Sequence, residues 1–428
     1  MVRLQIDFNK YLDENQVHNI TASVGFEANS TRYKATNAIY RGYYEDRGKQ
    51  FSATMLDDYP YYKNWVQNNY PTLTDNLTNL LSGYATVSYS YKNLFTLNAN
   101  TRMDGSNKFG DRSNEKLLPI WSVSGNYNLS EHNFFRRDWI DFIMLKASYG
   151  YQGNMLDGQS PQLIIKQLPT DPTYNELVSK VSVYPNPNLR WEKTTSWNAG
   201  LSFSVFDRRL QFEGEFYYKK THDAFLTREI SSVNGQSSYV VNSGNITNKG
   251  YNLSITAEPI RFKDFSWRVS TSFSKVFNEL QTLPGQDQYK LSDYLNGTAL
   301  IKGQPVGTFY SYKFVGLNPK DGSPLFDDKE EMQDELVNMT KYQLYTTVLT
   351  KSGRREPTMS GTFNNTIRYK QWRINAVFNY ALGSKVRLLK MFNSTIFSPS
   401  QNINRELLNG WRKPGDELNT NIPSPLSY

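Results

Sequence analysis

The segment Leu94–Gly110, LFTLNANTRMDGSNKFG, changes character half-way along. Its first half alternates between apolar and polar residues, which are Phe95, Leu97 and Ala99 against Thr96, Asn98 and Asn100. Alternation with a period of two predicts a β-strand with two unlike faces, whose apolar face contacts either a protein core or lipid. The second half is polar, and Asp104-Gly105-Ser106 predicts a turn in which glycine supplies a positive φ.

The composition excludes two classes of protein. The chain has 428 residues, of which 38% are hydrophobic and 14% aromatic, and its mean hydropathy is −0.63. No apolar run approaches the roughly 20 residues that a membrane-spanning helix needs. The aromatic content is too high for a disordered chain. The sequence therefore predicts a folded protein rich in β-structure.

Few residues are suited to catalysis or metal binding. The chain has no Cys and only three His residues, which lie far apart at His18, His132 and His222. This excludes a thiol nucleophile and argues against a zinc site. No catalytic motif is found, so we expect no enzyme activity, no metal site and no cofactor. The 48 basic residues are interleaved with 40 acidic ones, giving a net charge of +8, so nucleic acid is not an expected partner.

The alternating pattern recurs along most of the chain. It is present from the second residue onwards, no signal peptide precedes it, and we therefore expect the chain to be a piece of a longer protein. The segments that show it are Val2–Phe8, Ile20–Phe26, Ala85–Tyr91, Trp121–Leu129, Leu145–Tyr149, Trp197–Val205, Leu210–Tyr218, Tyr251–Ala257, Trp267–Phe273, Phe363–Tyr369 and Trp372–Tyr380.

Three properties of these segments favour lipid over a protein core. Their length, about 9–11 residues, suits a tilted membrane strand better than a soluble one. The polar faces consist mainly of Ser, Thr, Asn and Gly, which suits a wet lumen. The apolar faces often begin or end in aromatic residues, as an interfacial girdle would: Trp121, Trp197, Tyr218, Trp267, Trp372 and Tyr380. A large soluble sandwich or propeller is the alternative.

The connections between these segments come in two sizes. Short ones lie at 91–93, 206–209 and 369–371, and long ones at 29–81, 152–189, 277–358 and 388–428. Short turns on the periplasmic side and long loops outside are typical of outer-membrane barrels. We expect short helices only at 130–137 and around 402–409.

Seven motifs follow one another along nearly the whole chain. Together they resemble signatures of the SusC/RagA family of TonB-dependent outer-membrane transporters. They are Tyr89–Phe95 (YSYKNLF), Arg102–Gly110 (RMDGSNKFG), Leu118–Gly125 (LPIWSVSG), Leu145–Asn154 (LKASYGYQGN), Pro185–Thr194 (PNPNLRWEKT), Asn242–Gly250 (NSGNITNKG) and Trp411–Glu417 (WRKPGDE). Leu118 and Ile120 depart from the family's FPSVS segment.

The resemblance implies an all-β fold, a transmembrane antiparallel barrel in the bacterial outer membrane. Residues 1–428 would supply roughly 12–14 strands of a larger plugged barrel. The N-terminal plug and the C-terminal closing strands are absent from the sequence, so we expect either a fragment or a truncated reading frame.

The resemblance also implies active import of oligosaccharides or peptides. The implied partners are a SusD-like surface lipoprotein, outer-membrane lipid and the TonB-ExbB-ExbD complex, which would act through the plug. Two alternatives are a passive porin or structural outer-membrane barrel, and a soluble carbohydrate-binding β protein.

Most of the motif residues have a predicted structural role. Arg102 is expected to pair with a carboxylate at a strand end, and Trp191 to belong to the aromatic girdle. One loop, Asp57–Trp65, could recognise a ligand because flat aromatic rings with Asp and Asn neighbours stack on sugars or extended peptides. Its candidate substrate-binding residues are Tyr59, Tyr61, Tyr62 and Trp65.

Overall fold

Twelve strands dominate the structure, a computed structural model that describes residues 1–52, 59–92, 94–107, 117–132, 134–135, 137–154, 163–171, 173–186, 188, 190–231, 233, 238–282, 289–388 and 404–424. These strands are β1 Val2–Tyr11, β2 His18–Asn37, β5 Thr72–Tyr91, β6 Phe95–Ser106, β7 Leu117–Asn128, β8 Ile140–Asn154, β11 Glu192–Val205, β12 Leu210–Glu229, β13 Ser238–Arg261, β14 Phe265–Leu280, β19 Met359–Tyr369 and β20 Trp372–Leu382.

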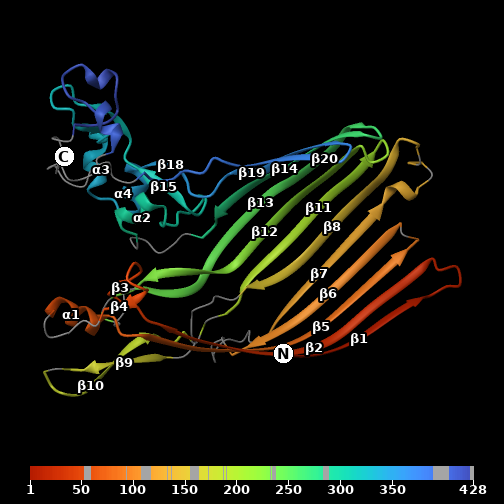
Figure 1. The fold of residues 1–428 in the computed structure, drawn as a ribbon, viewed down its shortest axis with the longest axis horizontal. Helices are drawn as coiled ribbons and strands as arrows, with labels where there is room; N and C mark the ends of the chain where they lie inside the picture. Colours follow the sequence, from red (N-terminus) through yellow and green to blue (C-terminus); the bar gives the residue numbers. More distant parts are fainter. Residues whose placement is uncertain are drawn as a thin grey trace.

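All twelve strands form one antiparallel sheet in which each strand pairs with the next in the chain (Figure 1). The order is β1-β2-β5-β6-β7-β8-β11-β12-β13-β14-β19-β20, so β1 and β20 are the two edges. This arrangement confirms the predicted partial antiparallel barrel and the expected number of strands.

The register places the alternating apolar residues of neighbouring strands on one face. Leu97 lies opposite Tyr89 of β5 and Gly125 of β7. At the far edge, Ile374 lies opposite Ile367, which in turn lies opposite Trp267. Leu97 is 40% exposed and Ile374 is 67% exposed, so no part of the chain that the structure describes covers them. A continuous exposed apolar face needs a non-aqueous neighbour, which favours lipid over a sandwich core.

The six predicted girdle residues all lie on this apolar face. Trp121, Trp197 and Trp372 are exposed, whereas the other three are half-buried. Trp267 donates its indole N–H to Asn365 Oδ1 at 3.0 Å. Aromatic side chains that combine an apolar ring with a polar group suit the boundary between lipid and water.

Several strands are much longer than the 9–11 residues that the sequence predicts. β2, β5 and β12 each have 20 residues and β13 has 24. The pairing of β2 with β5 continues beyond the amphipathic segments, where polar side chains on the two strands bond to each other. Arg32 donates to both carboxylate oxygens of Asp75, at 2.7 and 2.5 Å. The two ends of the expected loop at 29–81, residues 29–37 and 72–81, are therefore strands of a β-hairpin.

Tight turns join the strands at one end of the sheet. In the turn between β11 and β12, the residues Phe206, Asp207 and Arg208 all have positive φ. The turn is fixed from outside, because Asp141 Oδ2 accepts the backbone N–H of Arg208 at 2.8 Å. Such conformations are costly without glycine and persist only where neighbouring contacts support them.

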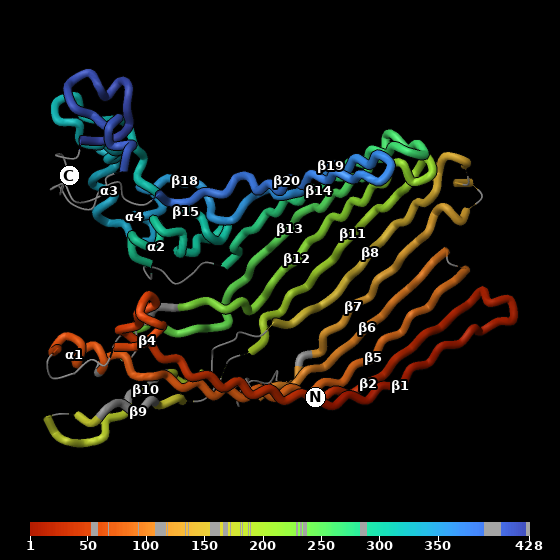
Figure 2. Tube along the Cα trace, viewed as in Figure 1, coloured from red at the N-terminus to blue at the C-terminus, as the bar shows by residue number. Residues whose placement is uncertain are grey.

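The opposite end of the sheet carries the folded loop regions (Figure 2). One region contains β3 Tyr43–Tyr44, β4 Gln50–Phe51 and α1 Pro60–Asn68, and a separate hairpin is formed by β9 Ile164–Thr170 and β10 Leu177–Val183. Residues 289–358 and 404–424 form what we call the loop lobe. Its elements are α2 Leu291–Asn296, β15 Thr308–Ser311, β16 Phe314–Leu317, β17 Pro324–Phe326, α3 Gln333–Leu336, α4 Lys341–Val348 and β18 Thr350–Arg354, with 3₁₀ helices at Glu330–Met332, Arg405–Asn409 and Asp416–Leu418.

The loop lobe has a small core of its own. Tyr294 is 1% exposed and packs in a cluster with Tyr310, Leu349, Ala299 and Ile301. Burial among neighbouring phenols raises the pKa of Tyr310 to about 12. The loop lobe is thus a folded unit with a core.

The structure corrects the expected helices. Helical turns are found near both predicted places, as 3₁₀ helices at Leu129–Glu131 and Arg405–Asn409. The helices α1 to α4 were not predicted. For α4 the signal was present in the sequence, because Thr340 and Gln343 form a capping box with bonds of 3.3 and 3.0 Å. Among the described residues, no helix has the length and apolar character needed to cross a membrane.

The two faces of the sheet predict opposite responses to a charge. Val123→Arg, on the apolar face, should lower the free energy of unfolding in phospholipid vesicles by about 2–4 kcal/mol. Ser124→Arg, the next residue on the polar face, should cost less than about 1 kcal/mol. Urea titrations of tryptophan fluorescence measure both, and equal losses would contradict the assignment of the faces.

Candidate functional site on the polar face

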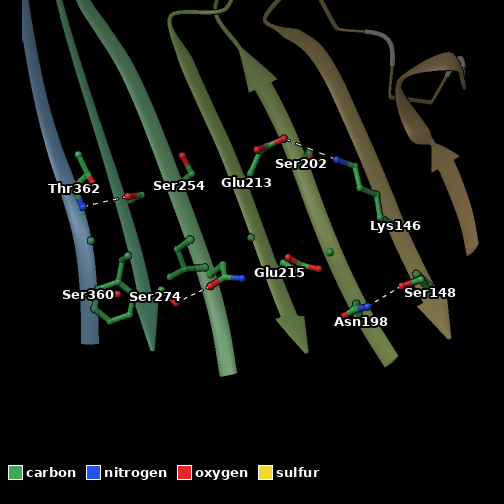
Figure 3. A pocket seen from close by; sticks show the side chains of 18 of the residues that line it. Lys146, Ser148, Asn198, Ser202, Glu213, Glu215, Ser254, Ser274, Ser360 and Thr362 are labelled. Carbon is green, nitrogen blue, oxygen red and sulfur yellow. Dashed lines mark hydrogen bonds and ion pairs between the residues drawn. The ribbon is translucent and has the colours of Figure 1, made fainter. Parts of the chain in front are cut away.

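The polar face of the sheet forms a hollow of about 880 Å³ that spans β7 to β20. Figure 3 shows its side chains side by side along the strands. Its polar lining consists of Ser124, Asn126, Lys146, Ser148, Asn198, Ser202, Glu213, Glu215, Asn252, Ser254, Ser272, Ser274, Ser360, Thr362 and Asn379. These are the residues that alternate with the apolar ones in the sequence.

Most of this lining is joined by neutral hydrogen bonds between strands. Asn198 donates to Ser148 Oγ at 2.9 Å (Figure 3), and Ser274 donates to Asn252 Oδ1 at 2.8 Å. Thr362 donates to Asn379 Oδ1 at 3.0 Å. Short hydroxyl and amide groups of this kind hold the wall together and still offer donors and acceptors to whatever occupies the lumen.

Three charged side chains interrupt the neutral wall near its centre. Lys146 lies opposite Gly200 on the neighbouring strand. Because glycine has no side chain, Lys146 can reach over that strand to Glu213 Oε1 at 3.8 Å. Glu215 is exposed on the same face, opposite Gly200 and Asn252. This part of the wall can make ionic as well as hydrogen-bonding contacts.

The hollow offers hydrogen-bonding and ionic groups. Its described lining contains Ser, Asn, Lys and Glu side chains and includes no His. Within the part of the chain that the structure describes, no three His, Asp or Glu residues are grouped so as to hold a metal ion.

The predicted ligand-binding residues lie elsewhere, on α1 at the loop end of the sheet. This segment is a helix and not the loop that we expected, because Pro60 suits its first turn and Tyr62 stacks on Trp65 one turn later. Asp57 and Asp58, which the prediction included, lie outside the described residues.

The structure divides the four aromatic residues into two pairs. Trp65 is half-buried, stacked by Tyr62 at 5.7 Å and covered by the Arg41 guanidinium at 4.4 Å from its ring centroid. These contacts fix α1 to the preceding loop. Tyr59 is 58% exposed and Tyr61 is 93% exposed, so their rings are accessible to a ligand or partner.

The Arg102 motif belongs to the wall and not to a turn. Arg102 donates to Asp104 Oδ1 at 2.7 Å and to Ser82 Oγ at 2.9 Å, which confirms the predicted carboxylate partner. Asp104-Gly105-Ser106 lies within β6, because Gly105 pairs with Leu81 on one side and Leu117 on the other. The predicted turn is therefore wrong, and Lys108–Gly110 lie outside the described residues.

Two further motifs, Pro185–Thr194 and Asn242–Gly250, are joined by hydrogen bonds where the sheet meets the loop regions. Asn242 donates its amide to the backbone oxygens of Arg190 and Asp223, at 2.8 and 2.9 Å. Arg190 forms an ion pair with Asp223, and Glu192 accepts the N–H of Phe225 at 2.8 Å. These bonds stabilise an irregularity in β12, where the register shifts between Thr221 and Phe225.

Trp191 is not a girdle residue. It is only 6% exposed, because the segment that contains it folds onto this network of hydrogen bonds. The prediction failed because the sequence next to a strand does not distinguish a tryptophan that faces lipid from one that is buried under a loop.

The W-x-x-PGD motif fastens residues 404–424 to the rest of the loop lobe. Trp411 is 8% exposed, and its indole N–H donates to Glu417 Oε2 at 3.2 Å. Asp416 accepts the N–H groups of Arg412 and Lys413 at 3.0 and 3.1 Å. Ser424 N–H donates to the carbonyl of Gly322, whose φ is +70° and whose missing Cβ would overlap the Trp411 ring.

Gly322→Ala should loosen the packing of residues 404–424 on the loop lobe. The added Cβ would overlap the Trp411 ring, and alanine is strained at this positive φ. Gly303→Ala is the matched control, because Gly303 has a φ of +76° and open space around its Cβ position. The control should cost only about 1 kcal/mol from the backbone. Hydrogen exchange of residues 404–424 measures the difference, and equal exchange in both variants would contradict the packing role.

The attachment of residues 404–424 to the loop lobe should also weaken in acid. Hydrogen bonds from its own backbone N–H, from Gly415 N–H and from the Trp411 indole hold the pKa of Glu417 below its usual 4.5. A carboxyl whose folded pKa is depressed stabilises the fold above its unfolded pKa and loses that contribution as pH falls through the folded pKa. The protection factors of residues 404–424, in which the intrinsic pH dependence of amide exchange is divided out, should therefore fall as pH is lowered from about 5 to about 3. Glu417→Gln should flatten this fall, and an unchanged profile in that variant would assign the effect to other groups.

Comparison with known proteins identifies the family. A family model described as TonB dependent receptor-like, beta-barrel matches residues 3–388. The chain belongs to this family of TonB-dependent receptors. Members are multi-pass β-barrels of the bacterial outer membrane, so the predicted location and fold class are confirmed.

Curated relatives support the resemblance to SusC. TonB-dependent receptor P39 of Formosa agariphila is 30% identical over 324 residues, which are 74% of this chain and 29% of that protein. TonB-dependent receptor P3 of the same organism is 27% identical over 82% of this chain and 36% of its own length. TonB-dependent receptor SusC of Bacteroides thetaiotaomicron is 30% identical over 50% of this chain and 22% of its own length. The chain thus spans about a third or less of these relatives.

Solved structures support the fold. The RagAB peptide transporter matches with a TM-score of 0.77 at 22% identity, over 100% of this chain and 46% of that chain. The same importer in its open-open state matches with a TM-score of 0.76 at 23% identity, over 99% of this chain and 44% of that chain.

Proposed function

We propose that this TonB-dependent receptor chain forms part of the barrel of an active outer-membrane importer for oligosaccharides or peptides. The observation that carries the proposal is the two-faced sheet, apolar on one side and lined by hydrogen-bonding groups on the other. A transporter needs such a wall, because its outside must suit lipid while its inside contacts polar cargo or a polar plug. Neither an enzyme nor a passive structural barrel accounts equally well for the family's relatives.

The proposed energy source is TonB with ExbB and ExbD, acting through a plug outside residues 1–428. We also propose that residues 1–428 are the barrel part alone and that the plug and the closing strands lie outside them. The open edges β1 and β20 support it, since a sheet in lipid must pair its edge groups.

The proposed partner at the outer surface is a SusD-like lipoprotein. The loop lobe offers a suitable surface, because its hairpin β16–β17 exposes apolar side chains. Val315 is 65% exposed, and Phe314 and Phe326 lie on one side of the hairpin with ring centroids 6.2 Å apart. Exposed aromatic residues in a folded loop are typical of protein interfaces.

The proposed substrate contacts are Tyr59 and Tyr61, with Tyr62 and Trp65 fixing the helix that presents them. Sugar rings and extended peptides both stack on exposed phenols. Uptake measurements with both classes of ligand distinguish between them.

Uptake of fluorescent oligosaccharides and peptides by intact cells tests the function. Cells producing the full-length polypeptide should accumulate one class of ligand, and deletion of TonB should abolish this accumulation. Tyr61→Ala should raise the half-saturating concentration about fivefold, the equivalent of about 1 kcal/mol, whereas Tyr61→Phe should not. Uptake that persists without TonB would show a passive porin, and unchanged saturation in Tyr61→Ala would remove that residue from the substrate site.

A further inference from the structure

Three arginines lie together on the polar face at the short-turn end of the sheet. They are Arg268 of β14, Arg368 of β19 and Arg373 of β20. Arg368 lies directly opposite Arg373 in the register, and Arg268 lies opposite Thr366, two residues along β19 from Arg368. On the apolar face, the same three strands present Trp267, Ile367 and Ile374.

This arrangement is electrostatically unfavourable by itself. Residues directly opposite each other in an antiparallel pair have Cβ atoms about 4.5–5.5 Å apart, and like charges at that spacing destabilise the pair. All three arginines are exposed. Arg368 donates a hydrogen bond to the backbone oxygen of Lys370 at 3.4 Å, and in the described part of the chain neither Arg368 nor Arg373 forms an ion pair.

The surrounding residues do not neutralise the cluster. The two strand ends and turn at 258–268 and 368–373 contain six basic residues and two acidic ones, a net charge of +4. One of the acids, Glu258, accepts a hydrogen bond from Arg261 at 2.7 Å and also interacts electrostatically with Arg268, so it balances part of the charge of Arg268 but not that of Arg368 or Arg373. Elsewhere on the polar face, by contrast, Lys146 has Glu213 as its partner.

We propose that this arginine cluster is a docking site for an acidic polypeptide segment, one with two or more Asp or Glu residues, at the periplasmic mouth of the lumen. Guanidinium groups bind carboxylates through paired, charge-assisted hydrogen bonds, so a segment with several carboxylates would relieve the repulsion between Arg368 and Arg373. A lipid headgroup fits less well, because the side of these strands that suits lipid is the opposite one, with Trp267 and Ile374. The site is independent of the proposed import activity and of the substrate.

Photo-crosslinking in the full-length polypeptide, in the outer membranes of cells that produce it, tests the site. Benzoylphenylalanine is placed at Ser266, which lies opposite Arg368 on the polar face, and at Phe265, the neighbouring residue on the apolar face. We expect the Ser266 adduct to be a peptide with two or more carboxylates, identified by mass spectrometry. Its yield should fall at least fivefold in the double variant Arg368→Gln, Arg373→Gln.

Matched controls separate the site from folding and from transport. The Phe265 adduct should be lipid and should not change in the double variant, and heat-modifiable gel mobility reports whether the barrel is folded. The double variant Arg368→Lys, Arg373→Lys keeps the charge and should keep most of the Ser266 adduct. A Ser266 adduct with lipid or with a carboxylate-free segment, no adduct at all, or a yield unaffected by the Gln variants would each overturn the proposal, whatever the uptake measurements show.

Discussion

The register of neighbouring strands is the constraint on which the rest of the structure depends. Side chains alternate between the faces of a strand, so a shift of one residue would move its whole apolar set to the other face. Over the amphipathic parts of the twelve-stranded sheet the ladders keep the same phase, from Ile6 opposite Val24 at one edge to Phe363 opposite Phe378 at the other. Register shifts lie at the ends of these parts, as in β12 between Thr221 and Phe225. The apolar surface for lipid and the polar wall of the lumen are both consequences of that shared phase.

The tight turns and the contacts at the loop end maintain this register. Lys92 and Lys370 adopt positive φ in two short connections, and their backbone N–H groups donate to the carbonyls of Val17 and Asp264 in the neighbouring connections. At the loop end, Arg354 donates to the backbone oxygens of Val276 and Pro357, while Arg387 donates to those of Leu295 and Tyr310. These arginines tie the loop lobe to β14 and to its own core. The lobe is therefore held in a defined place over one end of the wall.

The charges on the polar face divide into groups with different roles. Arg102 pairs with Asp104 of its own strand and donates to Ser82 of β5, while Lys146 of β8 pairs with Glu213 of β12, so both basic residues have partners within the sheet. Arg368 and Arg373 face each other and gain nothing from that arrangement within the described chain. Charges that are not balanced within a wall are better explained by what the wall contacts than by the stability of the wall itself.

The sequence by itself determined the barrel class, the count of strands, the outward-facing residues such as Leu97 and Ile374, and the pairing of Arg102 with a carboxylate. These follow from a period of two, a local property that each strand carries along its own length. Tertiary structure alone decided that Asp104-Gly105-Ser106 continues a strand, that Trp191 is buried and that Arg368 meets Arg373. Each of these depends on which residue of a neighbouring strand or loop lies opposite, and that is fixed only when segments far apart in the chain pair with one another.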